Sequence, residues 1–236
     1  MARQTAAVRM LLVHSPLVGP ATMRPLAAVF GAAGVDAIAP DLRAALGMPR
    51  PQWQAIVDLA ARAVHGSVDV LIGHSGAGAL LPLLADRLDT DVTVYVDAVV
   101  PGDDAHHVST AGFLELLDRL PREADDPLLP RWDTWWGPDT MTRLVPDDTL
   151  RAGLVDEMPR LPRAFYDDPV PLPQGWTGRH RCCFLQLGPA YDDERARAVA
   201  LGWPTDRIDG AHLDIAVRPT EVADRVRALI EQARRG

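Results

Sequence analysis

A short apolar run that leads directly into small residues carries the first side chain able to do covalent chemistry. Residues 68–78 read Val-Asp-Val-Leu-Ile-Gly-His-Ser-Gly-Ala-Gly, and a helical pattern follows over residues 79–88. A nucleophilic serine between a strand and a helix has a strained backbone, usually with positive φ, so its neighbours must be small. Ala77 stands where the usual G-x-S-x-G pattern has its second glycine, and alanine is still small. The stretch therefore predicts that Ser75 is an activated nucleophile.

The same stretch has a simpler interpretation, in which the small residues form a tight turn or bind a phosphate at a helix N-terminus. Phosphate-binding loops carry a Lys-Ser/Thr pair or a G-x-G-x-x-G spacing. The sequence around Ser75 has neither feature, so the nucleophile interpretation is favoured.

A second residue suited to this chemistry lies near the end of the chain. A serine hydroxyl is a weak nucleophile at neutral pH and needs a base whose pKa lies near the working pH, as a histidine pKa does. His212 follows the predicted last strand within Asp-Gly-Ala-His-Leu, where its alternative role is to cap the final helix. His74 is expected to point away from the serine because side chains alternate along a strand. His14 ends an earlier strand at the same sheet edge and is expected at the substrate site.

The third requirement is an acid that orients the imidazole and stabilises its cation. Asp97 lies at the tip of a strand between Val-Tyr-Val and Ala-Val-Val, and a carboxylate in such apolar surroundings is costly without a partner. Asp192 follows the next strand, where this arrangement most often has its acid, but Asp-Asp-Glu there also resembles an ordinary helix start. Both keep the order Ser, Asp, His. Asp97 is preferred, and Asp192 remains the alternative.

The elements that must position these residues alternate between strand and helix. Strands are expected at residues 8–13, 35–39, 68–75, 91–98, 182–187 and 205–208, and helices at residues 21–33, from 51, 79–88, 192–201 and from 220. Such alternation predicts an α/β fold with a mostly parallel, twisted sheet covered by helices on both faces. The carboxyl ends of parallel strands share one edge, which would bring the serine, the acid and the histidine together.

The alternation breaks after Pro101. Residues 102–178 contain helical patches, many prolines and 4 of the 6 tryptophans, and are too long for a simple connection. We expect an inserted helical lid there, with residues 1–101 and 179–236 forming the α/β core of a single domain. Trp132, Trp135 and Trp136 are candidate walls of an apolar substrate site, although packing of the lid on the core would also explain them.

Composition excludes several classes of function. The formal net charge of −8 does not favour nucleic acid or anionic membrane as a partner, and no run is long enough for a membrane-spanning helix. Cys182 and Cys183 are adjacent and are expected to be reduced core residues of a cytoplasmic protein. No Cys/His spacing suggests a metal site, and neither metal nor organic cofactor is expected. The expected partner is a small-molecule substrate.

Together these residues carry a resemblance to a known family. Gly-His-Ser-Gly-Ala-Gly, the loop after His14, the inserted segment and Gly-Ala-His-Leu near the end resemble the α/β-hydrolase superfamily. The layout is most similar to the small-lid branch with esterases, hydroxynitrile lyases and thioesterase-like enzymes, over about residues 8–233. This resemblance implies the α/β-hydrolase fold, but one fold hosts many chemistries.

The chain departs from this branch in one place. The resemblance implies that the backbone N–H groups of Pro16 and Gly76 form the oxyanion hole, and proline has no N–H. Either Leu17 or the Ser15 hydroxyl donates instead, or the hole has one donor fewer. Loss of one donor costs about 100- to 1,000-fold in acyl transfer.

The function predicted from the sequence is hydrolysis of an ester or thioester of a small to medium apolar molecule. Ser75 would attack, His212 would move the proton, Asp97 would orient it, and Gly76 and Leu17 would bind the oxyanion. The first alternative is a lyase, cyclase or epimerase on the same fold that uses His212 as its base. The second is a catalytically silent ligand-binding protein.

Overall fold

The computed structural model describes residues 8–102, 111–123 and 126–236 of the chain. Its centre is a parallel sheet with the strand order β2-β1-β3-β4-β5-β6. The strands are β1 (Arg9–Val13), β2 (Asp36–Ile38), β3 (Val70–Ser75), β4 (Val92–Ala98), β5 (Arg181–Gln186) and β6 (Thr205–Arg207). The predicted α/β class with a mostly parallel sheet is confirmed, and all the pairings among the described strands are parallel.

Both faces of the sheet are covered, which explains why its central strands read as continuous apolar runs. Alternate residues of one strand enter two separate cores. Leu71 of β3 packs with α2 (Gln52–Arg62) and α3 (Leu81–Leu88), whereas Val70 and Ile72 pack with α1 (Arg24–Ala32) and α9 (Pro219–Arg235). The remaining helices of this core are α7 (Asp192–Ala200) and α8 (Asp214–Val217), with short 3-10 turns η1 (Pro20–Thr22), η2 (Arg43–Gly47), η3 (Gly76–Leu80) and η7 (Pro189–Tyr191).

The chain order reverses between β1 and β3 of the sheet. The chain leaves β1, forms β2 on one side and then returns to form β3 on the other side. In open parallel sheets, ligands bind outside the carboxyl ends of the strands at such a reversal. The residues that follow β1, β3 and β4 are therefore the ones that this topology brings to a shared site.

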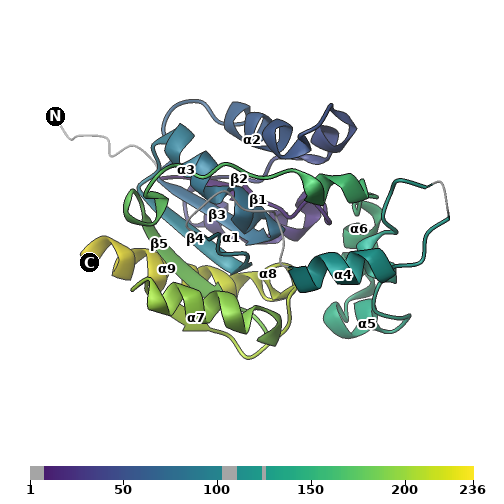
Figure 1. Cartoon of the computed structure of the whole chain (residues 1–236). Coiled ribbons are helices and arrows are strands. Elements are labelled where there is room, and N and C mark those ends of the chain that lie inside the picture. The colour runs from purple at the N-terminus through teal and green to yellow at the C-terminus, as the bar shows by residue number, and fades with distance from the viewer. Residues whose placement is uncertain (1–7, 103–110, 124–125) are drawn as a thin grey trace.

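The long connection between β4 and β5 contains mainly helices and turns. They are α4 (Ala111–Arg119), η4 (Trp132–Thr134), α5 (Thr140–Leu144), α6 (Asp148–Asp156), η5 (Arg163–Asp167) and η6 (Trp176–Gly178). Figure 1 shows α4, α5 and α6 gathered at one end of the sheet. Within this connection, residues 103–110 and 124–125 lie outside the described residues, so that part of the predicted 102–178 lid does too.

The β4–β5 connection packs against the core through both apolar and polar contacts. Met141, Leu154 and Met158 form a cluster with Val18 and Leu213, which lie in the loops after β1 and β6. At the surface, Glu157 accepts a hydrogen bond of 2.7 Å from the backbone N–H of Ala21 and forms an ion pair with Arg24. These contacts fix the connection over the loops that carry the candidate site.

Candidate active site

Ser75 lies at a sharp turn between β3 and η3. Its backbone has φ 58° and ψ −130°, a strained conformation for a residue other than glycine. Its carbonyl accepts a hydrogen bond from the N–H of Val99, which follows β4, so the turn is fixed by the neighbouring strand. The side chain reaches a cavity at the sheet edge. This geometry matches what the small residues around the serine predict.

Close packing explains the small residues on either side of the turn. A Cβ at Gly78 would lie 2.1 Å from the carbonyl oxygen of Val99, closer than any side chain allows. A Cβ at Gly73 would lie 2.7 Å from the Leu81 side chain. Ala77 is fully buried without such a requirement. The absolute need for glycine is therefore at Gly78, one residue after the position that the usual motif gives it.

His212 lies in the loop between β6 and α8 and is hydrogen-bonded to Asp97. The distance from His212 Nδ1 to Asp97 Oδ2 is 2.7 Å, and the Asp97 side chain is completely buried. An ionised carboxylate only accepts hydrogen bonds, so Nδ1 carries the proton in the neutral imidazole and Nε2 is left as an acceptor. The ring is thus held in the tautomer that a general base requires.

Asp97 is itself held in place by the backbone. Its φ is 44°, a left-handed conformation that aspartate tolerates better than most residues, at a point where the pairing of β3 with β4 shifts register. Its Oδ1 accepts hydrogen bonds from the N–H groups of Leu187 (2.9 Å) and Gly188 (3.4 Å). These donors compensate a buried carboxylate that apolar surroundings alone would disfavour.

Two further contacts fix the loop of His212. Asp214 accepts a hydrogen bond of 2.8 Å from the N–H of Ala211 and forms an ion pair with Arg218. The His74 ring stacks against the His212 ring at 4.5 Å between centroids, and His74 Nε2–H donates to the His212 carbonyl oxygen at 2.9 Å. Burial lowers the pKa of His74 well below its usual range, so it stays neutral. His74 therefore fixes His212 through ring stacking and a hydrogen bond to its backbone. Alternation of side chains along the strand predicted only that His74 points away from Ser75.

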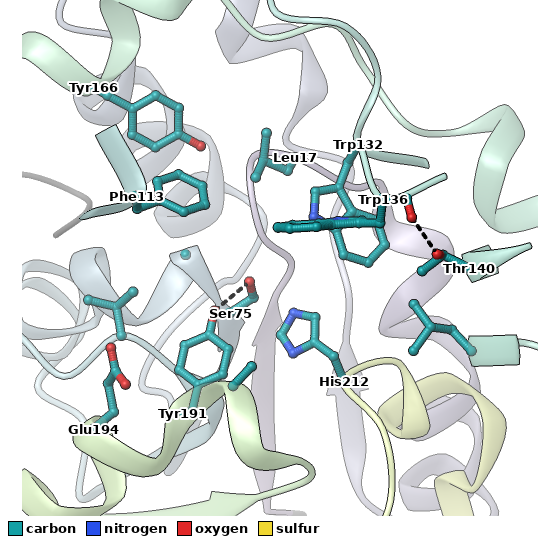
Figure 2. A pocket seen from close by; sticks show the side chains of 14 residues that line it. Leu17, Ser75, Phe113, Trp132, Trp136, Thr140, Tyr166, Tyr191, Glu194 and His212 are labelled. Atoms are coloured by element: carbon teal, nitrogen blue, oxygen red, sulfur yellow. Dashed lines mark hydrogen bonds between the residues drawn. The ribbon is translucent and has the colours of Figure 1, made fainter. Parts of the chain in front are cut away.

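The hydroxyl of Ser75 is hydrogen-bonded to Tyr191, which the sequence analysis missed. The two oxygens are 3.0 Å apart, and among the described residues no hydrogen bond joins Ser75 to His212 (Figure 2). The Tyr191 ring also stacks on the His212 ring, at 5.3 Å and 14° between planes. Burial raises the pKa of Tyr191, so the phenol stays protonated. The available signal was a tyrosine in the turn that follows the carboxyl end of β5, next to Asp192 in the sequence.

The structure separates two other candidates from this cluster. Asp192 accepts a hydrogen bond of 2.5 Å from the Gln186 amide at the start of α7, and its exposed carboxylate is not bonded to His212. His14 is buried, and its Nε2 accepts a hydrogen bond of 3.1 Å from the N–H of Leu42. His14 does not line the cavity, and its hydrogen bonds hold the loop after β1 against the loop after β2.

The cavity beside Ser75 has a volume of about 390 Å³ and mostly apolar walls. Its walls are Leu17, Ser75, Gly76, Val99, Phe113, Trp132, Trp136, Thr140, Leu144, Tyr166, Ala190, Tyr191, Glu194 and His212. Of the three tryptophans proposed as walls, Trp132 and Trp136 line it, and Trp132 lies 6.2 Å from His212 between ring centroids. Trp135 does not line it, because its ring packs against Phe113 and its indole N–H donates to the Pro130 carbonyl oxygen.

The turn after β1 packs directly on the residue after the serine. A Cβ at Gly76 would lie 3.3 Å from Ser15 Oγ and 3.6 Å from Pro16 Cδ. The N–H of Leu17 points at Ser15 Oγ at 3.4 Å, a long hydrogen bond. The Ser15 hydroxyl therefore lies next to Gly76, and Leu17 lines the same cavity as Gly76, so either is a candidate for the second oxyanion donor.

Within the described parts of the chain, no group of three or more His, Cys, Asp or Glu side chains is arranged to hold a metal ion. In those same parts, no helix is both long and apolar enough to cross a membrane.

Comparison with known proteins gives the family. A search of curated proteins found no match. Among solved structures, an extracellular α/β-hydrolase from a Paenibacillus species is similar with a TM-score of 0.72 and 16% identity, over 96% of this chain and 98% of that chain. Polyneuridine aldehyde esterase follows with a TM-score of 0.69 and 18% identity, over 96% and 99% of the two chains. Tomato methylketone synthase I, complexed with 2-tridecanone, has a TM-score of 0.70 and 14% identity over 97% and 99%.

At these identities the likeness shows the fold alone. The sequence itself matches a family model over residues 10–234, nearly its whole length. The resemblance drawn from the sequence motifs is thereby confirmed, and the chain belongs to the alpha/beta hydrolase family.

Proposed function

We propose that this protein is a serine hydrolase that cleaves an ester or thioester of a small to medium apolar molecule. In this proposal Ser75 is the nucleophile, His212 the general base and Asp97 the acid that orients the base. The hydrogen bond of 2.7 Å between His212 and the fully buried Asp97, beside a cavity that Ser75 also lines, carries the proposal. Ser75 ends β3, Asp97 lies near the end of β4 and His212 follows β6, so only the sheet edge brings them together.

The reaction begins when the Ser75 hydroxyl turns from Tyr191 to His212 Nε2. As Oγ bonds to the acyl carbon, its proton passes to Nε2, and the resulting imidazolium is stabilised by Asp97. The tetrahedral intermediate then expels the alcohol or thiol, which takes the proton from Nε2 and leaves the acyl group on Ser75. Water, activated by the same nitrogen, cleaves the acyl-enzyme to the acid and restores the serine.

Charge on the acyl oxygen requires donors beside Gly76. We assign the backbone N–H of Gly76 as one donor, and the Ser15 hydroxyl or the N–H of Leu17 as the second. Pro16 is compatible with this assignment, because its fixed φ restricts the conformation of the turn that carries Ser15 and Leu17. Donors at about 2.7–3.1 Å from the oxyanion would supply most of the electrostatic stabilisation.

The walls of the cavity support an apolar substrate. Phe113, Trp132, Trp136 and Tyr166 surround the space above Ser75, and aromatic walls favour alkyl and ring-bearing groups. Because all four of these residues lie in the long β4–β5 connection, we propose that this connection acts as the lid of the site. Similar folds bind small molecules, as in the complex of tomato methylketone synthase I with 2-tridecanone.

Labelling and turnover test the proposal together. A fluorophosphonate should label the wild-type protein, and p-nitrophenyl butyrate should be hydrolysed with a burst of one equivalent of nitrophenol. Ser75→Ala should lose both signals, whereas Ser67→Ala, a change at an exposed serine before β3, should keep both. Labelling that persists in Ser75→Ala would contradict the assignment of the nucleophile.

One observation favours a second candidate, a lyase-type reaction in which His212 removes a proton from the substrate. Pro16 takes away the usual second donor, and the N–H of Leu17 already points at Ser15 Oγ. If that N–H does not turn to the oxyanion and Ser15 does not replace it, acyl transfer would be slow. Ser75 that is labelled by fluorophosphonate, in a protein that shows no turnover of p-nitrophenyl esters, would support this candidate over hydrolysis.

A further inference from the structure

One wall of the otherwise apolar cavity is a carboxylate. Glu194, in the first turn of α7, lines the cavity together with Tyr191 and Phe113. In the view of Figure 2, Glu194 lies on the same side of Ser75 as Phe113 and Tyr166, opposite Trp132 and Trp136. The hydrolysis proposed above does not use it.

Glu194 has no positive partner in the described structure. No hydrogen bond or ion pair reaches its carboxylate from another described side chain, although arginines at many other places are paired with carboxylates. The described residues that line the cavity include no arginine, and the sequence has no lysine. Burial, with the nearby charges of Asp193 and Asp97, raises the pKa of Glu194. Among the described residues, its carboxylate is bonded only to its own backbone N–H at the start of α7, so no described positive charge neutralises it.

The walls around Glu194 suit an organic cation better than a hydrated ion. Phe113 and Tyr166 lie edge to face at 5.6 Å between ring centroids, and Tyr191 adds a third ring to the same cavity. Aromatic faces attract alkylammonium groups, and a carboxylate strengthens this attraction when water is excluded. Among the described residues that line the cavity, Glu194 is the only acidic or basic side chain besides His212, and its carboxylate would repel an anionic group.

We propose that the Glu194 end of the cavity binds a substituted ammonium group, so that the preferred ester carries a positive charge beside the bond that Ser75 attacks. This inference rests on the proposed hydrolase function and narrows its substrate class to esters that join one cationic group to an otherwise apolar body. It makes Glu194 a specificity-determining residue and leaves the chemical steps with Ser75 and His212.

The test compares two esters of the same shape. Butyrylcholine and 3,3-dimethylbutyl butyrate differ in a quaternary nitrogen that replaces a carbon, so the ratio of their kcat/KM values reports recognition of the charge. We expect a ratio of at least ten in the wild type and a fall of about tenfold or more in Glu194→Gln. The control Glu231→Gln removes the same net charge from an exposed position on α9 and should leave the ratio unchanged. A ratio that Glu194→Gln does not alter overturns the proposal.

A binding measurement separates this inference from the proposed hydrolysis. Calorimetric titration with benzyltrimethylammonium needs no turnover, and its Kd should rise about tenfold or more in Glu194→Gln but not in Glu231→Gln. If no ester is cleaved but this difference in Kd is found, the hydrolase proposal fails and the cation site stands. Equal Kd values in the two variants overturn the cation site, even if esters are hydrolysed.

The thermal unfolding temperature gives a last check. Because burial disfavours the ionised carboxylate and no described positive charge neutralises it, Glu194→Gln should unfold at or above the wild-type temperature. A lower Tm would show a structural role for Glu194 and would count against the proposal.

Discussion

Replacement of Asp97 by asparagine should reduce catalysis far more than it disturbs the fold. Asparagine has nearly the same shape and also tolerates the left-handed backbone that Asp97 adopts at φ 44°. The change removes a charge and turns one acceptor oxygen into a donor NH₂ group. The surroundings of Asp97 decide which of its hydrogen bonds is then lost.

Each of the two possible orientations of the new amide disrupts hydrogen bonding at the site. Leu187 and Gly188 donate N–H groups to Oδ1, at 2.9 and 3.4 Å, and His212 donates Nδ1–H to Oδ2 at 2.7 Å. An amide oxygen that stays with the backbone donors turns its NH₂ group toward His212, which must then accept at Nδ1 and carry its proton on Nε2. An imidazole in that tautomer cannot accept the proton of Ser75. The flipped amide instead opposes two backbone N–H donors in a buried place, at a cost of about 1–3 kcal/mol.

The expected magnitude follows from these losses. The wrong tautomer and the missing charge beside the imidazolium should lower kcat about 10,000-fold, or about 5 kcal/mol in activation free energy. KM should change little, because Asp97 does not line the cavity. Asp192→Asn is the matched control and should change kcat less than threefold, since Asp192 is bonded to Gln186 and not to His212.

Steady-state hydrolysis of p-nitrophenyl butyrate by the two variants measures both effects, with circular dichroism to show that each is folded. A folded Asp97→Asn protein that keeps kcat within tenfold of the wild type would refute the role given to Asp97. A large loss in Asp192→Asn with a small loss in Asp97→Asn would move the orienting role to Asp192.

Three further changes test the surroundings of the nucleophile. Tyr191→Phe removes the hydrogen bond that competes for the Ser75 hydroxyl, worth about 1 kcal/mol, so fluorophosphonate labelling should become about fivefold faster; slower labelling would mean that the phenol assists the reaction. Pro16→Gly should lower ester turnover because the turn loses its fixed φ, and a large gain would instead show a deficient oxyanion hole. Gly78→Ala should lower the free energy of unfolding, measured by chemical denaturation, by several kcal/mol or prevent folding, since its Cβ would lie 2.1 Å from a backbone oxygen. The control Gly31→Ala in α1 has open space around its Cβ and should change that free energy by no more than about 1 kcal/mol.

Local patterns in the sequence were enough to predict the sheet and its central turn. The central strands β1, β3, β4 and β5 were found because they carry apolar runs between turn residues, which is the direct consequence of burial on both faces. Ser75 was found because a positive φ and close approach to a neighbouring strand leave room only for small residues. These signals depend on a few consecutive residues, so they survive without knowledge of the rest of the chain.

For contacts between distant segments, the sequence reduced the number of candidate residues but did not show which of them meet. Asp97 and Asp192 were both reasonable partners for His212, and only the register of β4 and the path of the loop after β6 place Asp97 within 2.7 Å of it. The hydrogen bond from Ser75 to Tyr191 joins residues 116 positions apart, and no local pattern encodes such a pair. Trp135 and Trp136 are neighbours in the chain, yet only Trp136 lines the cavity.

Backbone conformation and burial restrict residue types locally, so the fold class, the central strands and the strained serine could be predicted from the residues alone. The tertiary structure alone decided which acid meets the histidine, which aromatic rings form the cavity and which carboxylate stands in it. The physical reason is that a side-chain hydrogen bond requires agreement within a few tenths of an ångström. Such agreement is set by the packing of the whole sheet and of the β4–β5 connection above it.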